Sequence, residues 1–257
     1  MSENISVVII AKNEEKDIPR CLNSLKNFAD EIIVVDDEST DNTAKIALEY
    51  GAKVFRRPLN NNFAEQTNFG INKAKNNWIF IIDADEELTE DLKKEIIERI
   101  GKEEYSAYQM PIKNIFYGKF LEYGGVKGYK IRLFKKSNAY FIGEVHQNLI
   151  VNGKIGTLKN YFIHHLKSVD DYLFKILKYT DIEAKNFVNS QNKIKLKEVK
   201  YRLTYKTFKT FFKLYIKKKG YKDGHQGLIW AILNTIGPQI RWLKIYDKAF
   251  KEDKLEF

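Results

Sequence analysis

Short apolar runs alternate with segments of helical periodicity through the first hundred residues. The runs are rich in Ile and Val and nearly unbroken, which is typical of buried strands in a parallel sheet. They cover residues 5–11, 31–36, 52–55 and 78–83. Between them, the apolar spacing predicts helices over residues 14–28, 40–50 and 63–74. Strands that alternate with such helices indicate right-handed βαβ units, and therefore an α/β fold with a mainly parallel sheet flanked by helices.

The pattern changes after residue 100. Further strands are expected over residues 105–117 and 130–135. Helices are expected over residues 168–189, 200–219 and 223–248. We expect the last helix to be interrupted near Gly237-Pro238, because proline lacks the N–H that a helix interior needs. No low-complexity linker occurs, so the prediction is an α/β domain of residues 1–165 with a helical region of residues 166–257 packed on it.

The composition suits a globular intracellular protein. Of the 257 residues 44% are hydrophobic, which is enough for a packed core. The polar start and the short apolar run after it do not resemble a signal peptide, and no stretch is long enough to span a membrane. The single Cys21 gives no disulfide framework and fits a reducing compartment. The expected location is the cytoplasm.

The net charge of +10 is unevenly distributed, and the excess of basic residues peaks over residues 206–222. A basic surface attracts polyanions such as nucleic acid, anionic lipid or a phosphorylated substrate. The sequence contains no clear DNA- or RNA-binding motif, so nucleic acid is not expected as a partner. A non-enzymatic polyanion-binding module nevertheless stays open as an alternative function.

Acidic and amide side chains follow three of the predicted strands. They lie in Lys12-Asn13-Glu14, in Asp36 to Asp41 and in Asp83-Ala84-Asp85. The carboxyl ends of parallel strands share one edge of a sheet, where ligands of α/β proteins bind. Two neighbouring carboxylates repel each other unless a cation neutralises them, and Mg²⁺ or Mn²⁺ would link them to substrate phosphates. The alternative is that these residues only cap turns and helices.

Two phosphate-binding loops are missing from the sequence. No Gly-x-Gly-x-x-Gly motif follows the first strand, and no Walker-type Gly-Lys-Ser/Thr motif occurs. A bound diphosphate would therefore need a metal ion in place of a glycine-rich loop. A nucleotidyltransferase on a similar fold is a second alternative, but it would need a basic, glycine-rich loop where Ala11-Lys12-Asn13-Glu14 stands.

The motifs at these strand ends resemble family 2 glycosyltransferases with the Rossmann-like GT-A fold. They are residues 5–14, residues 34–43 and Asp83-Ala84-Asp85-Glu86. Other segments are similar to the lipopolysaccharide-core β-glucosyltransferase subgroup, namely residues 66–70, 132–134, 144–147, 164–165 and 221–224. The resemblance implies a metal-dependent inverting transfer of a hexose, glucose favoured, from a UDP-linked donor. The implied acceptor is a saccharide or glycolipid of the cell envelope.

The resemblance also implies roles for individual residues. Asp36 would contact the nucleoside, with Ala11 and Glu14 lining the same pocket. Asp83 would bind the ribose or a metal-bound water, and Asp85 would ligate the metal. Gln66 and Ala84 are assigned to the donor site as well. His146 is placed near the diphosphate or metal, against the alternative of a structural histidine.

Three positions depart from the family pattern. Glu38 stands where a glycine is usual, and Thr67 stands where a basic residue is frequent. Gln147 replaces the glutamate of the subgroup, and glutamine cannot act as a base. The candidates for the catalytic base are therefore Glu144 and Glu122.

Residues 205–219 mix aromatic side chains with lysines. One interpretation is an amphipathic helix on an anionic membrane, peripheral on the cytoplasmic face of the inner membrane. The other is a helix packed on the core with a solvated basic face.

Overall fold

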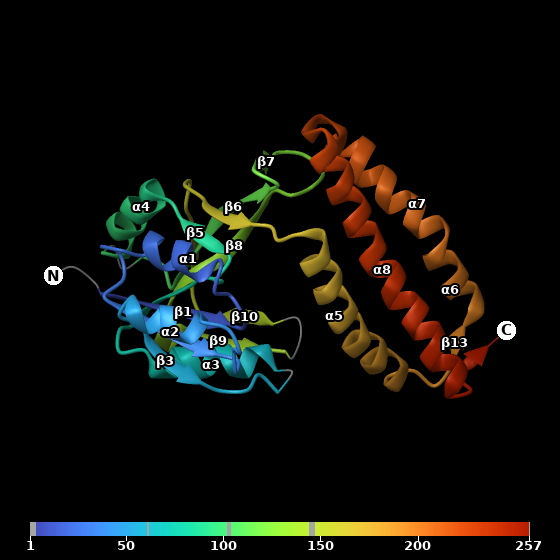
Figure 1. Ribbon diagram of the computed structural model, residues 1–257, viewed down its shortest axis with the longest axis horizontal. Helices are drawn as coiled ribbons and strands as arrows, with labels where there is room; N and C mark the ends of the chain where they lie inside the picture. Colours follow the sequence, from blue (N-terminus) through green and yellow to red (C-terminus); the bar gives the residue numbers. More distant parts are fainter. Residues whose placement is uncertain (1–3, 61, 102–103, 144–146, 257) are drawn as a thin grey trace. The chain divides into compact units, whose positions relative to one another are not determined.

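The computed structural model describes residues 4–60, 62–101, 104–143 and 147–256. The chain divides into two compact units (Figure 1). Unit 1 consists of Met1–Asn114 and Gly128–His165, and unit 2 of Ile115–Lys127 and Leu166–Phe257.

Unit 1 is built on a mixed, mainly parallel sheet of the expected α/β class. Its principal strands are β1 (Ile5–Ala11), β2 (Glu31–Asp36), β3 (Lys53–Arg56), β4 (Trp78–Ile81), β5 (Glu86–Leu88), β6 (Ala107–Phe116), β8 (Gly128–Lys135) and β12 (Phe162–His165). They are ordered β3-β2-β1-β4-β8-β6-β12-β5, and β11 (Ile155–Thr157) also pairs with β6. The pairs among β1, β2, β3 and β4 are parallel, whereas β8 runs antiparallel to β4 and β6.

Alternate side chains of β1 enter two hydrophobic cores, as expected for a strand buried on both faces. Val7 and Ile9 pack with residues of α1 (Ile18–Ser24) and α4 (Glu90–Ile100). Val8 packs toward α3 (Phe63–Lys73) on the other face. A Cβ on Gly70 of α3 would lie 2.6 Å from Val8 Cγ1, so α3 approaches the sheet at a distance that only glycine permits.

A small antiparallel pair adjoins α3. It consists of β9 (Ala139–Ile142) and β10 (Asn148–Val151), and it follows a 3-10 turn at Lys136–Asn138. The Asn68 amide of α3 bonds both backbone groups of Phe141, donating to the oxygen and accepting from the nitrogen. These bonds hold the β9–β10 pair against α3.

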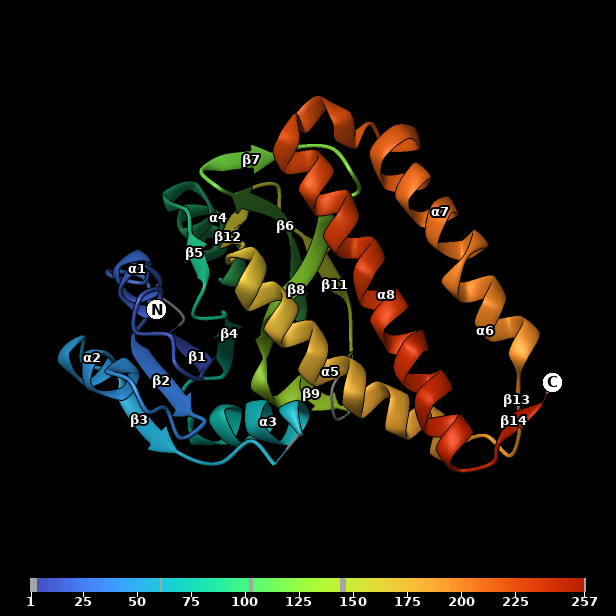
Figure 2. The same cartoon turned by 45° about the vertical axis from the view of Figure 1, so that its right-hand side comes forward.

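Unit 2 is mainly helical. It contains β7 (Lys119–Leu121), α5 (Val169–Asn189), α6 (Leu196–Leu203), α7 (Tyr205–Phe212), a π-helix (Lys213–Lys217), a 3-10 turn (Gly220–Asp223) and α8 (His225–Lys251). The short strands β13 (Ile194–Lys195) and β14 (Leu255–Glu256) pair in parallel. Helix α8 lies between α5 and the α6–α7 pair in both views (Figures 1 and 2). No helix in the described ranges has the length and apolarity that crossing a bilayer requires.

Several element boundaries differ from the sequence prediction. Helix α8 runs through Pro238 without the expected interruption, because packing beside Ile176 of α5 outweighs the cost of one missing hydrogen bond. Residues 86–88 form a strand, and the following helix begins at Glu90 after the N-cap Thr89. The helix expected over residues 40–50 is α2 (Thr43–Glu49), which starts three residues later than expected.

Candidate active site

The loops that follow β1 and β2 are joined by hydrogen bonds between side chains and backbone. The two strands are in parallel register, with Ala11 opposite Asp36. Beyond them, side-chain oxygens of one loop accept hydrogen bonds from backbone N–H groups of the other. The bonds are Asn13 N to Ser39 Oγ (2.9 Å), Glu14 N to Thr43 Oγ1 (2.7 Å), Glu15 N to Asp41 Oδ2 (3.1 Å) and Thr40 N to Asn13 Oδ1 (2.9 Å). Residues 39–42 are committed to these bonds, so the helix begins only at Thr43.

Glu38 lies inside this pair of loops with a φ of 52°. This left-handed conformation is the one that glycine adopts without steric cost. The backbone geometry therefore explains why glycine is usual at this position in the family pattern, and the present chain accepts a strained residue there.

Asp36 has an unpaired oxygen in a buried place. The residue is only 1% exposed, and its Oδ2 accepts a hydrogen bond from Ser39 N at 3.1 Å, with Arg56 Nε at 3.9 Å. Its Oδ1 is buried and has no hydrogen-bond partner among the described residues. Leaving such an acceptor unsatisfied costs about 1–3 kcal/mol, so this atom is ready to accept a hydrogen bond from a ligand. Ala11 and Glu14 lie at the same edge.

The Asp83-Ala84-Asp85 turn follows β4 at this edge. Strand β4 is parallel to β1, and Ile82 N donates to Val8 O. The Asp83 side chain is half exposed and pairs with Arg132 at 2.7 Å. The Asp85 side chain is nearly buried, with His164 Nε2 at 3.8 Å. The sequence-based placement of both carboxylates beside the end of β1 therefore agrees with the structure.

Arg132 of β8 connects two carboxylates of this acidic segment. Its guanidinium also pairs with Glu86 at 2.5 Å, and Glu86 Oε2 accepts from Asp83 N at 3.0 Å. Burial raises the pKa of Glu86 to about 7, although Arg132 opposes the shift. Burial alone would lower the pKa of Arg132, but the charges of Asp83 and Glu86 raise it. The guanidinium is thus a permanent cation paired with Asp83 and Glu86.

His164 of β12 is the second basic side chain beside the acidic turn. Its Nδ1 is 2.9 Å from Asn114 Oδ1, which leaves Nε2 turned toward Asp85. Burial lowers the pKa of His164, but the hydrogen bond and charge of Asp85 outweigh burial and raise it. Asp85 therefore faces a histidine that is more easily protonated than usual.

The aspartates fit a hydrated divalent cation. The described residues contain no group of three or more His, Cys, Asp and Glu side chains arranged to hold a metal. A closed protein cage is not needed for Mg²⁺ or Mn²⁺, because these ions keep several waters and bind through one or two carboxylates plus substrate phosphates. Asp85 and the half-exposed Asp83 are the residues that could supply oxygen donors for that arrangement.

Gln66 and Thr67 of α3 are both buried, and each is committed to a contact. Both ends of the Gln66 amide bond Arg57, with Nε2 donating to Arg57 O at 2.6 Å and Oε1 accepting from the guanidinium. Thr67 Oγ1 lies 3.0 Å from Gln147 Oε1. Two positions that depart from the family pattern are therefore in direct contact. The donor-binding role of Gln66 stays a prediction, and any such role involves Arg57.

The remaining candidates are Glu144, His146 and Glu122. Glu144 and His146 lie outside the described residues. Glu122 belongs to unit 2, where it pairs with Lys127 at 2.9 Å. Its backbone N–H donates to the buried carboxylate of Asp223, which also accepts from Tyr123 N at 2.9 Å. Asp223 thus fixes the loop that carries Glu122.

Sequence reasoning missed Arg57, Arg132 and His164 as members of the site. Arg57 directly follows β3, so a basic residue at a fourth strand end was a usable signal. Arg132 and His164 belonged to segments noted only for their resemblance to the subgroup. Their contacts join residues 49 and 79 positions apart in the sequence, across antiparallel strands whose pairing the apolar pattern did not predict.

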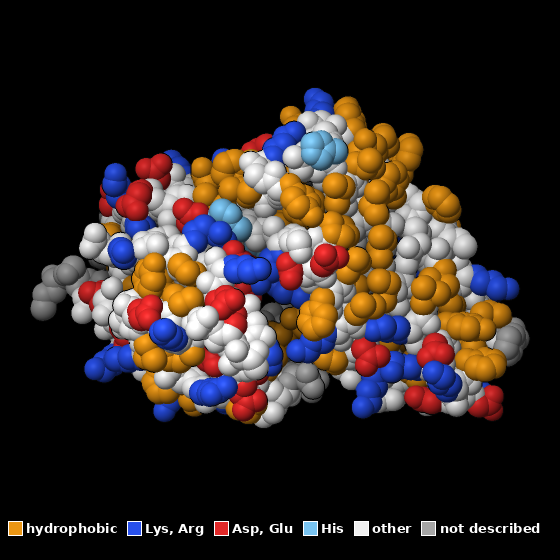
Figure 3. Space-filling view, viewed as in Figure 1, with side chains coloured by type: hydrophobic (Ala, Val, Ile, Leu, Met, Phe, Trp, Pro, Cys, Tyr) orange, Lys and Arg blue, Asp and Glu red, His pale blue; other side chains and the backbone are white. Residues whose placement is uncertain are grey.

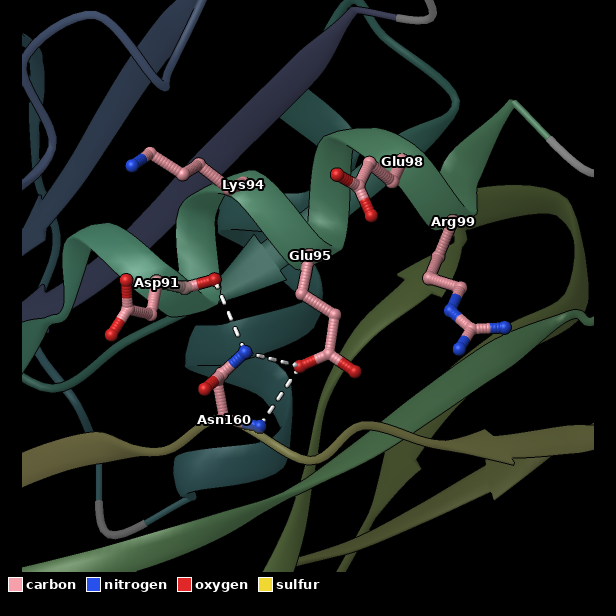
Figure 4. Close-up of a pocket in the computed structure, with 6 residues that line it drawn as sticks. All are labelled: Asp91, Lys94, Glu95, Glu98, Arg99 and Asn160. Carbon is pink, nitrogen blue, oxygen red and sulfur yellow. Dashed lines mark hydrogen bonds between the residues drawn. The ribbon is translucent and has the colours of Figure 1, made fainter.

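A cavity of about 350 Å³ lies away from these residues (Figure 4). It is lined by Asp91, Lys94, Glu95, Glu98, Arg99 and Asn160. The Glu95 carboxylate accepts hydrogen bonds from the backbone of Lys159 and Asn160 and from the Asn160 amide. These bonds attach the 159–160 turn to α4, which is a structural role.

Comparison with known proteins gives consistent matches over most of the chain. The family model "Glycosyl transferase family 2" matches residues 6–158. An uncharacterized glycosyltransferase of Rickettsia conorii is 31% identical, covering 98% of this chain and 93% of the relative. The lipopolysaccharide core biosynthesis glycosyltransferase LpsC of Rhizobium meliloti is 25% identical, covering 95% and 92%. A crystal structure of S. aureus TarS with UDP-GlcNAc is 16% identical, with a TM-score of 0.49 over 98% of this chain and 92% of that chain.

Proposed function

Because the chain belongs to glycosyl transferase family 2, we propose that it transfers a hexose, glucose favoured, from a UDP-linked donor to a cell-envelope acceptor. The acceptor class is a saccharide or glycolipid of a lipopolysaccharide-like core. Full-length similarity to a lipopolysaccharide core glycosyltransferase supports this class.

The unpaired Oδ1 of Asp36 is the observation that carries the proposed donor site. A buried carboxylate oxygen at the end of β2 accepts an N–H or O–H from a nucleoside base or ribose. The interlocked loops hold this oxygen in position before the donor arrives, so little ordering is needed on binding.

Asp85, together with Asp83, would hold Mg²⁺ or Mn²⁺ next to the diphosphate. When bound, the ion offsets the negative charge that builds on the leaving diphosphate. Arg132 and His164 keep the two carboxylates in place between turnovers, since each aspartate faces one of these basic side chains. Arg57, positioned by Gln66, is a further cation near the end of β3.

Inversion requires a base that removes the acceptor proton while the new glycosidic bond forms. Such a step contributes roughly 10²–10⁴-fold to the rate. Glu144 and Glu122 are our candidates for this base. The anomeric carbon passes through an oxocarbenium-like state, as in glycoside hydrolysis, and no covalent enzyme intermediate forms.

The first test substitutes the proposed metal ligand. Asp85→Ala should lower turnover of a UDP-hexose by about a hundredfold or more, because removing one group that stabilises transition-state charge usually costs that much. It should also remove the Mn²⁺-dependent rise in melting temperature that UDP-hexose gives to the native protein. Asp91→Ala, an exposed aspartate at the start of α4, is the matched control and should change neither value.

The donor class is tested in the same thermal assay with UDP-, GDP- and CDP-sugars. A metal-dependent rise with the UDP-sugars alone is the expected result. An Asp85→Ala protein that keeps the wild-type rate would contradict the metal site. A folded wild-type protein that responds to no nucleotide would contradict the donor site.

A further inference from the structure

A continuous stripe of exposed apolar side chains runs along α6, α7 and the π-helix. Its members follow one another at intervals of three or four residues, so those within α7 lie on one side of that helix, and Tyr201 continues the line across the non-helical Thr204 by contacting Tyr205. They are Tyr201, Tyr205, Phe208, Phe212 and Ile216, and between 41% and 75% of each residue is exposed. Tyr201 and Tyr205 stack on each other with ring centroids 5.5 Å apart. Figure 3 shows hydrophobic side chains gathered over α7 and α8 on the face in view.

This stripe is not the side of the helix that packs inside unit 2. One contact with α8 is made by Thr207, whose Oγ1 accepts from Gln239 Nε2 at 3.1 Å. Leu203 packs against the core that contains Trp242. Single exposed apolar residues are ordinary, but five that succeed one another along α6, α7 and the π-helix indicate a surface that meets a partner.

A basic residue directly follows every member of the stripe. These residues are Arg202, Lys206, Lys209, Lys213 and Lys217. Each step along a helix turns by about 100°, so the cations form a second line along one flank of the stripe. Arg202 pairs with Glu198 at 3.0 Å, whereas the four lysines are exposed and form no ion pair with any described residue. No acidic residue occurs between Glu198 and Asp223.

The chemistry of this surface selects its partner. Isologous pairing of two copies through the stripe would bring two lines of unneutralised lysines together, which is unfavourable. Residues 201–217 contain no Asn or Gln with which to read adenine, so bidentate base readout by this segment would be confined to guanine contacts by Arg and Lys. A partner that is apolar inside and anionic at its surface complements both the apolar stripe and the line of lysines. The lysines extend to the headgroups while the aromatic side chains insert below them.

We propose that Tyr201, Tyr205, Phe208, Phe212 and Ile216, with the four flanking lysines, form a docking face for an anionic lipid bilayer. This inference goes beyond the transfer reaction. It is tested without donor or acceptor, so its failure would leave the proposed reaction untouched. Docking would place the enzyme in the plane where a lipid-linked acceptor lies.

The experiment measures co-sedimentation of the full chain with two vesicle types. One is phosphatidylcholine alone, and the other contains equal parts of phosphatidylcholine and phosphatidylglycerol. We expect binding to the anionic vesicles that weakens as salt is added, and much weaker binding to the neutral ones. Phe208→Ser with Phe212→Ser should lower the partition coefficient by roughly tenfold or more. Lys209→Glu with Lys213→Glu should lower it by at least about 25-fold, since each lysine near the surface contributes about fivefold.

Control variants carry the same types of substitution elsewhere in the chain. Phe174→Ser removes an exposed phenylalanine of α5 that is not in the stripe. Lys16→Glu with Lys45→Glu reverses two exposed lysines of unit 1. Both proteins should bind vesicles within about twofold of wild type if the effect is local. Circular dichroism melts check that the Phe208 and Phe212 variant is folded.

Several outcomes would overturn the proposal. These are equal or negligible binding to both vesicle types, or controls that lose as much binding as the stripe variants. A dimer seen by light scattering that the stripe variants dissociate would assign the face to a second copy instead. Tight binding of a single-stranded oligonucleotide that the stripe variants lose, without vesicle binding, would assign it to nucleic acid.

Discussion

Thr67 and Gln147 form a neutral contact at two positions where the family pattern favours charged residues. The Thr67 hydroxyl has one hydrogen but two neighbouring acceptors, Phe63 O at 2.9 Å and Gln147 Oε1 at 3.0 Å. Both contacts are satisfied if Thr67 donates to Phe63 O and the Gln147 side chain turns its amide N–H toward the hydroxyl. A glutamine therefore suits this buried threonine in a way that an ionised glutamate cannot.

Gln147→Glu should destabilise the protein in a pH-dependent manner. An ionised carboxylate only accepts hydrogen bonds, so at pH 7.5 it competes with Phe63 O for the single hydrogen and costs about 1–2 kcal/mol. At a pH where this carboxyl is protonated, its O–H can donate to Thr67 and the loss should shrink. Urea denaturation of both proteins at pH 7.5 and pH 4.5 measures the difference.

The control for this substitution is Gln109→Glu. Gln109 Nε2 donates to Thr157 Oγ1 at 2.9 Å in an exposed pair, where water can replace the lost bond. It should therefore change stability by less than Gln147→Glu at pH 7.5. Equal stability of wild type and Gln147→Glu at both pH values would show that the amide is not needed.

At the residue scale, the sequence predicted that Asp36, Asp83 and Asp85 lie at strand ends, because Asp36 and Asp83 directly follow the apolar residues of their runs and Asp85 comes two residues after Asp83. It could not predict which partners hold them. The contact of Thr67 with Gln147 spans 80 residues, and that of Asp83 with Arg132 spans 49. Such pairs depend on how distant elements pack, which local periodicity does not encode.

Glu31 joins the first three strands at the start of β2. Its carboxylate accepts hydrogen bonds from Ser6 Oγ of β1 (2.7 Å), Lys75 N (2.8 Å) and the Lys53 ammonium of β3. Burial alone would raise the pKa of Glu31, but these three bonds outweigh burial and lower it below its usual value. The ionised form is therefore the one that stabilises this end of the sheet.

Glu31→Gln should cost about 1–2 kcal/mol of unfolding free energy at pH 7, because charge-assisted bonds become neutral ones. A lowered folded-state pKa contributes stability above the ordinary glutamate pKa and loses it as the pH falls through the folded value. The difference between the two proteins should therefore disappear in the acid range. Denaturation curves between pH 7 and pH 3 measure it.

Glu49→Gln changes an exposed glutamate at the end of α2 and serves as the control. Its effect should stay within about 0.5 kcal/mol at every pH. A constant offset between wild type and Glu31→Gln across the whole range would contradict the assignment of the lowered pKa to native-state bonds.

At the element scale, the buried strands of the parallel part agree closely with their apolar runs, because both faces of those strands are covered. The boundaries that failed were set by specific contacts. Thr204 separates α6 from α7 with a non-helical backbone conformation, inside what the spacing suggested was one helix. The interruption predicted at Pro238 was wrong in the opposite sense, since the helix continues through this residue where tertiary packing holds it.

At the scale of the whole molecule, unit 2 includes a segment from the middle of the chain. Phe116, Leu121 and Val126 pack in one cluster with Leu233 of α8. The sequence placed the boundary of the two parts at residue 165, and it gave no sign that residues 115–127 pack with the C-terminal helices. Their apolar side chains suited either part equally well.

A fragment of residues 1–165 should therefore associate in solution. Removing the C-terminal helices exposes Phe116, Leu121 and Val126 to water. Each side chain then loses about 1.5–3 kcal/mol of the free energy that its burial contributes. Size-exclusion chromatography and binding of a hydrophobic dye, compared with the full chain, check this. The same fragment with all three residues changed to serine should stay monomeric and bind less dye. A monomeric, dye-free unmodified fragment would instead support a boundary at residue 165.

The interlocked loops after β1 and β2 also bear on how the chain folds during synthesis. The bonds between them join residues 11–15 to residues 37–43. The strands that carry them are adjacent in both sequence and space, so closing this contact requires a short loop. The pair of loops beside Asp36 can therefore form once β1, β2 and the residues up to 43 have left the ribosome. The acidic turn can be completed only after β8 and β12, which bear Arg132 and His164, have been made.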